Sequence, residues 1–216
     1  MNFTKIKGKI MIKKVTVKGF NTENTYFNID SKTNHGFLID PGYEGEKLLE
    51  MIKENEWVIE AILITHGHFD HIGEVNHLKS CLNCAVYAGE KAQIYFRNVE
   101  YNLSYMTGHE ITIIDYSPVR EGEKIALKAN NNFYLEVMNT PGHTMDGVVY
   151  YNKEEKIAFV GDTIFKGTYG RTDLPGSSED EIQESIKKIL NMDEDMILYP
   201  GHSAETSVGE ERANWI

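Results

Sequence analysis

The stretch Thr65-His66-Gly67-His68-Phe69-Asp70-His71 holds three histidines and one aspartate within seven residues. It follows a run from 58 to 64 that is apolar except for Glu60, and this composition predicts a buried strand. Three imidazoles and a carboxylate at this density serve no purpose in packing, and their protonated forms would repel one another. The stretch therefore predicts a metal site where a strand turns into a helix.

Three further strand-like runs end in residues of the same kind. Their ends read Gly142-His143, Gly161-Asp162 and Gly201-His202, each on a turn. In an extended segment alternate side chains share a face, so His66 and His68 can converge on one ion. Asp70 and His71 can reach a second ion, and the residues at the other strand ends complete the two sets, with the aspartate as a candidate bridge. We expect two divalent ions, with zinc first and iron or manganese as alternatives.

Length, charge and cysteine content limit the possible partners. The chain has 216 residues, with 22 basic against 33 acidic side chains and a net charge of −11. Nucleic acids and anionic membranes bind basic surfaces, so neither is expected as a partner. No apolar run reaches the ~18 residues of a membrane span, and no apolar signal core follows Met1. The two cysteines, Cys81 and Cys84, do not form a secreted disulfide framework, so we expect a cytoplasmic protein.

The order of the expected elements defines a fold class. Strand-like runs are 10–17, 26–29, 36–39, 58–64, 85–87, 133–137, 148–151, 156–160 and 197–199, and helix-like runs are 48–52, 72–82 and 179–190. The first three strands are typical of a meander, and Ser178 with Glu181 predicts a capping box for the last helix. Strands followed by helices in both halves favour an α+β fold, with two sheets packed face to face and helices outside.

The ligand-bearing motifs resemble, in type and order, those of the metallo-β-lactamase superfamily. They are Thr-His-x-His-x-Asp-His, Pro-Gly-His-Thr, Gly-Asp-Thr and Pro-Gly-His, together with Leu38-Ile39-Asp40-Pro41-Gly42 and Gly170-Arg171-Thr172-Asp173. The resemblance extends from Phe37 to His202 and is nearest to the short glyoxalase II-like branch, the hydroxyacylglutathione hydrolase family. It implies a four-layer αββα sandwich with the metals at one edge between the sheets.

The resemblance also implies the ligand sets. The first metal would bind His66, His68 and His143, the second Asp70, His71 and His202, and Asp162 would bridge them. Glycine at 67 is unlike the flavo-diiron branch, and histidine at 71 is unlike the commonest true β-lactamases. Full-length glyoxalase II continues into a helical domain that binds glutathione, whereas 14 residues follow His202 here. We therefore expect a single domain over 1–216, without that helical domain.

Together these residues predict a metal-dependent hydrolase. Two cations sharing a water lower its pKa to about 7, and the hydroxide would attack the carbonyl of a small thioester of lactoylglutathione type. Asp70 and Asp162 are the candidate catalytic residues, Asp70 through proton handling and Asp162 by holding both ions. The alternative is a mononuclear non-haem iron persulfide dioxygenase of the same superfamily, with His66, His143 and Asp162 on iron. Lactone hydrolysis and a non-catalytic metal-binding module are further interpretations.

Candidate substrate contacts lie in the loop after the third motif. They are Lys166, Tyr169 and Arg171. Arg171 either pairs with Asp173 and shapes the loop, or meets a substrate carboxylate. The family often has glycine where Asp146 stands, so we expect the loop after His143 to be shaped differently.

Overall fold

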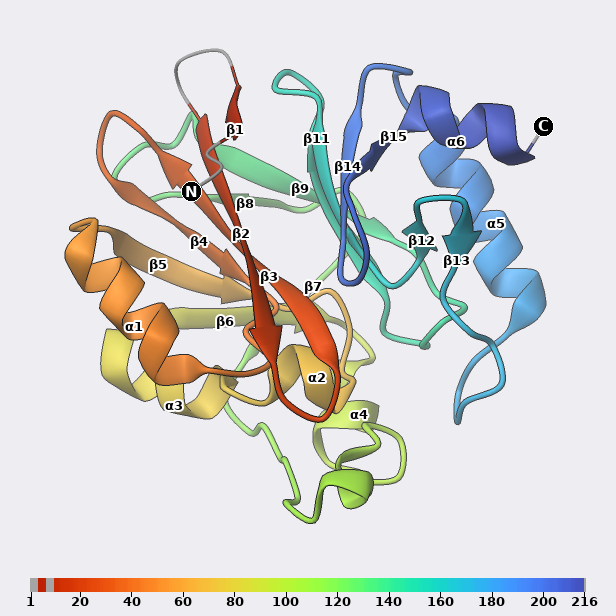
Figure 1. Ribbon diagram of the computed structural model, residues 1–216, viewed down its shortest axis with the longest axis horizontal. Coiled ribbons are helices and arrows are strands. Elements are labelled where there is room, and N and C mark those ends of the chain that lie inside the picture. The colour runs from red at the N-terminus through yellow and green to blue at the C-terminus, as the bar shows by residue number, and fades with distance from the viewer. Residues whose placement is uncertain (1–3, 7–9, 216) are drawn as a thin grey trace.

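Two β-sheets lie face to face in a computed structural model of the protein, and helices cover the outer face of each (Figure 1). The structure describes residues 4–6 and 10–215, so most of the N-terminal stretch in which a signal core would begin lies outside the described residues. The helical layers and the two sheets form four layers, which confirms the predicted α+β fold of αββα type. Within the described ranges, no helix is long and apolar enough to cross a membrane.

The first sheet contains seven strands in the order β1 to β7. They are β1 (Thr4–Ile6), β2 (Ile10–Lys18), β3 (Thr22–Asp30), β4 (His35–Ile39), β5 (Val58–Leu63), β6 (Ala85–Gly89) and β7 (Ser117–Val119). Strands β1 to β4 pair antiparallel, and the expected meander is thereby confirmed, whereas β4 to β7 pair parallel. Parallel neighbours need crossover connections, and α1 (Gly45–Glu54), α3 (Val75–Leu82) and α4 (Ala92–Phe96) lie within these connections.

The second sheet has six strands in the order β15-β14-β11-β10-β9-β8. They are β8 (Lys124–Ala126), β9 (Tyr134–Asn139), β10 (Val148–Asn152), β11 (Ile157–Gly161), β14 (Ile197–Pro200) and β15 (Thr206–Ser207). The expected hairpin of β10 and β11 pairs Tyr150 with Phe159. Helices α5 (Glu179–Leu190) and α6 (Val208–Trp215) lie on the outer side, and β12 (Ile164–Phe165) and β13 (Thr168–Tyr169) form a separate small hairpin.

Three apolar cores hold the four layers together. Between the sheets, the rings of Tyr26, Phe159 and Tyr199 pack with centroids 5.3 to 5.5 Å apart. The other face of the first sheet packs under α1 and α3, and the other face of the second packs under α5. Because strands such as β10 and β11 are buried on both faces, their sequences are continuous apolar runs rather than alternating ones.

The helix expected over residues 72–82 is interrupted. The structure has a short helix, α2 (Phe69–Ile72), and then α3, with Gly73 between them. A Cβ at Gly73 would lie 2.2 Å from the backbone oxygen of Gly42, because the chain passes directly against the loop that follows β4. Helix α2 therefore packs with the loops at the sheet edge and is separate from α3.

The start of α5 is tied to the loop that carries His143. The Oγ atom of Ser178 accepts a hydrogen bond from the Glu181 amide at 3.3 Å, which is the first half of the predicted capping box. The Ser178 amide donates to the Gly142 carbonyl at 2.7 Å, and Ser177 Oγ donates to the His143 carbonyl at 2.7 Å. A helix of the outer layer therefore fixes the backbone of a candidate metal ligand.

Replacing Ser178 with alanine should destabilise the protein without unfolding it. Loss of a helix N-cap costs about 1 kcal/mol, because an amide of the first turn loses its partner. We expect urea denaturation to show a free energy of unfolding lower by about 1 kcal/mol in S178A. The matched variant S178D keeps a side chain that can cap, so it should lose less than half as much; an equal loss in both variants would contradict the capping role.

Candidate metal centre

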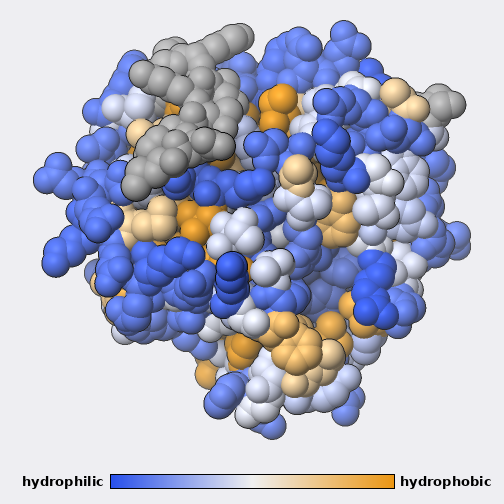
Figure 2. Space-filling model, viewed as in Figure 1, coloured by the Kyte–Doolittle hydropathy of each residue, from blue (hydrophilic) through white to orange (hydrophobic). Residues whose placement is uncertain are grey.

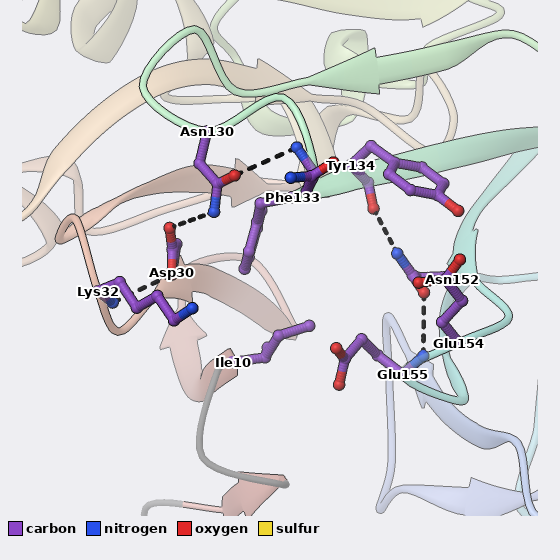
Figure 3. A pocket seen from close by; sticks show the side chains of 10 residues that line it. Ile10, Asp30, Lys32, Asn130, Phe133, Tyr134, Asn152, Glu154 and Glu155 are labelled. Carbon is purple, nitrogen blue, oxygen red and sulfur yellow. Dashed lines mark hydrogen bonds between the residues drawn. The ribbon is translucent and has the colours of Figure 1, made fainter.

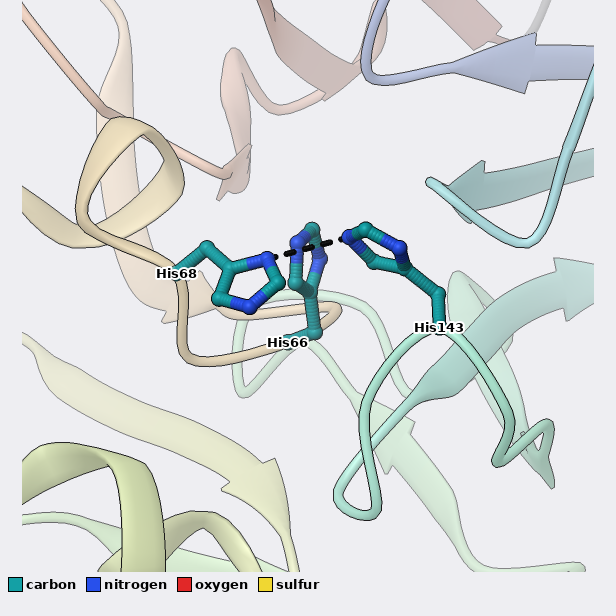
Figure 4. Close-up of side chains that lie close together, drawn as sticks. All are labelled: His66, His68 and His143. Atoms are coloured by element: carbon teal, nitrogen blue, oxygen red, sulfur yellow. Dashed lines mark hydrogen bonds between the residues drawn. The ribbon is translucent and has the colours of Figure 1, made fainter. Parts of the chain in front are cut away.

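The ends of four strands meet at one edge of the two sheets. His66 follows β5 of the first sheet, whereas His143, Asp162 and His202 follow β9, β11 and β14 of the second. Figure 4 shows His66 and His68 on one loop and His143 on another, with their rings directed toward one another. The structure brings all seven predicted ligands together here, in groups whose ligand atoms lie within 4.8 Å of one another. Strands position such side chains more accurately than free loops do.

The first group consists of His66, His68 and His143, all buried. His68 Nδ1 lies 3.0 Å from His143 Nε2. Two nitrogens bound to one tetrahedral zinc ion at about 2.05 Å would lie about 3.3 Å apart, so this separation suits a shared cation. The ring of His66 lies 4.9 Å from each of the other two rings. Three imidazoles thus surround one point.

The second group consists of Asp70, His71 and His202. His202 Nε2 lies 3.4 Å from Asp70 Oδ2. Asp162 lies between the two groups, because its Oδ2 is 3.4 Å from His202 Nε2 and 3.6 Å from His143 Nε2. Its Oδ1 is 3.5 Å from His71 Nε2. This carboxylate is therefore in the position that a bridge between two cations requires.

Several polar atoms of this centre are buried without a hydrogen-bond partner. They are His66 Nε2, His68 Nε2, His71 Nε2 and Asp162 Oδ1. A buried polar atom left without a partner costs about 1–3 kcal/mol, so four of them in one cluster indicate a ligand that satisfies them. Imidazole nitrogens and carboxylate oxygens bind zinc and iron, and the residues present fit two divalent cations.

Hydrogen bonds behind the centre decide which ring nitrogen faces it. His143 Nδ1 lies 2.9 Å from the Arg171 carbonyl, and His202 Nδ1 lies 2.7 Å from the Thr22 carbonyl. A carbonyl only accepts, so each Nδ1 must carry the proton and donate. The Nε2 atoms of His143 and His202 are then free to bind a metal, which is how second-layer partners fix the tautomer of a ligand.

The carboxylate of Asp40 connects the loops on both sides of the ligand stretch. Its Oδ1 accepts a hydrogen bond from the Thr65 amide at 2.8 Å, and its Oδ2 accepts one from Thr65 Oγ1 at 2.6 Å. His71 Nδ1 donates to the same Oδ2 at 3.0 Å, which leaves Nε2 facing the centre. Asp40 itself has a φ of 49°, a conformation that aspartate tolerates better than most residues do.

The histidines of the two ligand groups differ in the direction of their pKa shifts. Burial lowers the pKa of His68 to about 3, and the adjacent His143 acts in the same direction. Burial also opposes protonation of His202, but Asp162 and Asp70 outweigh it and raise the pKa of His202 to about 11. Burial also lowers the pKa of His66 and of His143, so the first group is neutral at pH 7 and can offer its lone pairs. At His202 a cation would take the place that the proton holds between the two carboxylates.

A family match covers this centre. The sequence model of the metallo-beta-lactamase superfamily matches residues 21–202, a range that includes every predicted ligand. The chain belongs to the metallo-β-lactamase superfamily. Its fold and its paired histidine and carboxylate groups are those of a metallo-hydrolase of this superfamily.

Similar proteins carry names that agree with this membership. The chain is 35% identical to the probable metallo-hydrolase YqgX of Bacillus subtilis, over 88% of this chain and 89% of YqgX. It is 32% identical to the hydroxyacylglutathione hydrolase GloC of Haemophilus influenzae, over 81% of this chain and 83% of GloC. Among solved structures, the B3 metallo-β-lactamase BLEG-1 superposes with a TM-score of 0.86 at 31% identity, over 94% of this chain and 97% of BLEG-1. TTHA1623, solved in a di-iron-bound form, superposes with a TM-score of 0.83 at 31% identity, over 94% of this chain and 98% of TTHA1623.

A cavity of about 360 Å³ opens over the metallo-β-lactamase centre. Five of the ligands form part of its lining, and the walls include Phe20, Phe69, Leu103, Met106, Leu174 and Arg171. Of the three predicted substrate contacts, Arg171 lines this cavity, and it also bonds Asp173 through two nitrogens at 2.6 and 2.7 Å. The pairing that the sequence left open for Arg171 is therefore present.

The other two predicted contacts point elsewhere. Lys166 Nζ lies 3.4 Å from a carboxylate oxygen of Glu210. The ring of Tyr169 packs against Trp215 with centroids 5.2 Å apart, and its hydroxyl donates to Glu179 at 2.8 Å. Neither residue is among those that line the cavity over the metal centre. None of the apolar wall residues was among the predicted contacts. Except for Phe69, which lies within the histidine-rich stretch, they come from segments outside the ligand motifs.

A second cavity, of about 380 Å³, lies at the other end of the sandwich (Figure 3). Asp30, at the end of β3 opposite Thr22, lines it. Two of its asparagine side chains have partners: Asn130 Nδ2 donates to the Asp30 carboxylate at 2.9 Å, and Asn152 Nδ2 donates to the backbone carbonyl of Tyr134 at 2.9 Å. These groups are satisfied already, in contrast to those of the metal centre.

The loop after His143 turns the side chain of Asp146 inward. A Cβ at Gly67, between two ligands, would lie 3.1 Å from Asp146 Oδ2, so this carboxyl fills the space beside the histidine loop. Burial raises the pKa of Asp146 to about 7. Where the family often has glycine, this chain therefore has a buried, titratable carboxyl that packs against the ligand loop.

Replacing Asp40 with asparagine should weaken the second metal position. Asparagine tolerates the left-handed backbone conformation, but it offers no anion to hold the proton on His71 Nδ1. We expect the affinity for the more weakly held metal ion to fall by about 10- to 100-fold, measured by competition with a chromogenic chelator. D193N, which changes an exposed aspartate paired with Lys156, is the control and should match the parent chain. Unchanged affinity in D40N would show that Asp40 does not support the site.

Replacing Asp146 with asparagine should change how stability depends on pH. The folded pKa of about 7 lies above the ordinary 3.8, so the folded state holds a proton that the unfolded state has lost between these values. The Asp146 contribution to stability therefore falls as pH rises from about 4 to about 7 and then stays low. Three pKa units correspond to about 4 kcal/mol at most.

The measurement is urea denaturation of metal-loaded protein at pH 5, 6.5 and 8. D146N should gain stability over the parent chain as pH rises, reaching about 2–4 kcal/mol at pH 8. E54Q, which changes an exposed carboxylate at the end of α1, should show no such trend. A constant difference between D146N and the parent across this range would contradict the raised pKa.

Proposed function

We propose that the protein hydrolyses a small thioester of lactoylglutathione type with two divalent metal ions. The single observation that carries this proposal is the pair of ligand groups joined by Asp162, whose oxygens face His71 on one side and His143 on the other. These two ligand groups would hold two divalent cations, with Asp162 between them. We propose zinc first, and iron as the alternative, because TTHA1623 at 31% identity is described in a di-iron-bound form.

The chemistry divides between the metals and the side chains. When bound, the two ions lower the pKa of a shared water from 15.7 to about 7 and polarise the carbonyl of the substrate. Asp162 sets the distance between the two ligand groups. A thiolate is a good leaving group because thiols have a pKa of about 8.5, so no side chain has to protonate it.

Asp70 is the candidate for proton handling. The Asn21 amide donates to its Oδ2 at 2.5 Å, and His202 Nε2 lies 3.4 Å from the same oxygen. Burial favours the protonated acid, but His71 and His202 outweigh it and hold the pKa of Asp70 well below its ordinary value. This lowered pKa makes Asp70 a weak base, so its part in proton handling is to accept a hydrogen bond from the attacking water in the cavity that it lines.

The glyoxalase II-like branch is part of the proposal. The name of GloC, hydroxyacylglutathione hydrolase, supports thioester chemistry, and the name of YqgX supports a metallo-hydrolase without giving a substrate. A cytoplasmic location remains a prediction from the cysteine content.

A mononuclear iron persulfide dioxygenase is the second candidate. It would use His66, His143 and Asp162, and the structure of ETHE1 from Myxococcus xanthus shares the fold with a TM-score of 0.77 at 22% identity. The second group of ligands favours the dinuclear hydrolase, since one iron has no use for Asp70, His71 and His202 together. Aerobic oxygen uptake with glutathione persulfide, measured beside thioester hydrolysis, distinguishes the two activities.

The test of the proposed function combines metal content with two variants. We expect about two metal ions for each chain, thioester hydrolysis that is lost with a chelator, and recovery on adding metal. D162A should lose at least about 10³-fold in kcat/KM, because it removes the group that holds both ions. R171A should lose less than about tenfold, because Arg171 bonds Asp173 and contributes only its backbone carbonyl to His143.

Two outcomes would contradict the proposal. One is a stoichiometry fixed at one ion after metal supplementation, with oxygen uptake in place of hydrolysis. The other is a fully metal-loaded R171A that is as inactive as D162A, which would place the reacting group of the substrate on Arg171.

A further inference from the structure

We propose that the cavity over the metal centre selects substrates with an apolar, uncharged substituent beside the scissile thioester. This inference rests on the proposed thioester hydrolysis and, within that activity, favours thioesters of uncharged carriers over lactoylglutathione itself. It follows from the distribution of apolar and charged side chains around the cavity. Away from the metal ligands, the carboxylates of glutathione would find no unpaired lysine or arginine among the described residues of the lining.

The cavity has one strongly apolar wall. Phe20 and Met106 line it and remain 61% and 45% exposed, and both are among the large apolar residues that the fold leaves in contact with water. Phe20 packs edge-to-face on Phe69, with ring centroids 5.7 Å apart, and Leu103 and Leu174 extend the surface. An exposed apolar surface that continues into a metal site indicates a place for an apolar part of the ligand.

Three loop segments, together with Phe69 of α2, build this wall. Phe20 lies at the tip of the β2–β3 hairpin, Met106 in the 3-10 turn at Ser104–Thr107, and Leu174 in the loop between β13 and α5. Figure 1 shows these segments gathered at the lower side of the molecule. In Figure 2 apolar side chains are clustered there, over the hairpin tip and α4, beside a hollow with hydrophilic walls. Because these loops lie around one opening, the wall can surround an apolar substituent of the substrate.

The charges around the cavity disfavour an anionic substrate tail. Among the described residues that line it, Arg171 is the one lysine or arginine, and its guanidinium already bonds both oxygens of Asp173. Lys166, on the nearby loop, faces Glu210. Away from the metal centre, the described lining therefore offers a substrate carboxylate no lysine or arginine that is free of a partner, and the net charge of −11 adds repulsion.

The experiment compares kcat/KM across two series of thioesters with the metal-loaded protein. One series keeps a neutral thiol and lengthens the acyl group from acetyl to hexanoyl, and the other keeps acetyl and exchanges an alkyl thiol for glutathione. We expect kcat/KM to rise by about two- to threefold for each methylene added to the acyl group. The acetyl thioester of glutathione should be no better than that of a short neutral thiol.

Variants locate the effect on the wall. F20A should reduce the ratio of hexanoyl to acetyl kcat/KM by about tenfold, and M106A should reduce it by about threefold. Y105A is the matched control, since Tyr105 is also exposed and adjacent to Met106 but does not line the cavity. Its ratio should equal that of the parent chain.

Binding separates this inference from the proposed function. Non-hydrolysable thioether analogues of the same series, titrated by calorimetry, should bind more tightly as the alkyl group lengthens, and F20A should abolish the trend. If no thioester is hydrolysed but this trend holds, the proposed function is wrong and the apolar subsite stands. If thioesters are hydrolysed with the same kcat/KM for all chain lengths, or with a preference of about 100-fold for glutathione, the apolar subsite is overturned and the hydrolase stands.

Discussion

The hydrogen bonds of the Asp40 carboxylate are the interaction on which the metal centre depends. One side chain at the end of β4 holds the amide and hydroxyl of Thr65 and the ring of His71. These two contacts lie at the first and last residues of the histidine-rich stretch, so they fix a loop that would otherwise be free to move. The sheet supplies the rigidity, because β4 and β5 are parallel neighbours in its middle. The directions of the remaining ligands follow from equally short connections to strand ends.

The cavity divides into two parts with different origins. Its floor consists of the metal ligands, which lie at strand ends and in the short α2 helix. Buried hydrogen bonds, such as the one from His143 to the Arg171 carbonyl, hold these ligands in place. Its wall consists of loop residues such as Phe20 and Met106, which have few fixed partners and remain exposed. Chemistry that needs accurate geometry thus depends on the sheets, whereas selectivity depends on loops, which tolerate substitution. The wall can therefore vary between relatives without disturbing the ligands.

The parts of the structure that local sequence determines could be predicted. The ligand positions follow from spacing, since His66 and His68 alternate along an extended segment and His143, Asp162 and His202 each follow an apolar strand. The cap at Ser178 is also local. The break at Gly73 could not be predicted, because it results from contact with Gly42, a residue of a distant loop.

The sequence did not predict the environment of residues whose neighbours come from distant parts of the chain. Glu23 is fully buried, and burial together with Asp40 raises its pKa well above the ordinary value, yet nothing in its local sequence indicates this. Tyr169 follows a ligand loop closely enough to suggest substrate contact, but a turn of the β12–β13 hairpin directs its ring to Trp215. The apolar wall comes from three loop segments and α2, whose meeting depends on the complete fold.

The first ligand group draws two members from one sheet and one from the other. His66 and His68 follow β5, whereas His143 follows β9, and Ser177 ties His143 in turn to the outer helix. A cation held by all three thus acts as a cross-link between the two halves of the chain. Without the cation, the buried imidazoles and carboxylates would need water as a hydrogen-bond partner. The two sheets would then separate first at this edge. The bound metal would then protect the chain from proteolysis as well as provide its chemistry, so the lifetime of the protein would depend on the supply of metal.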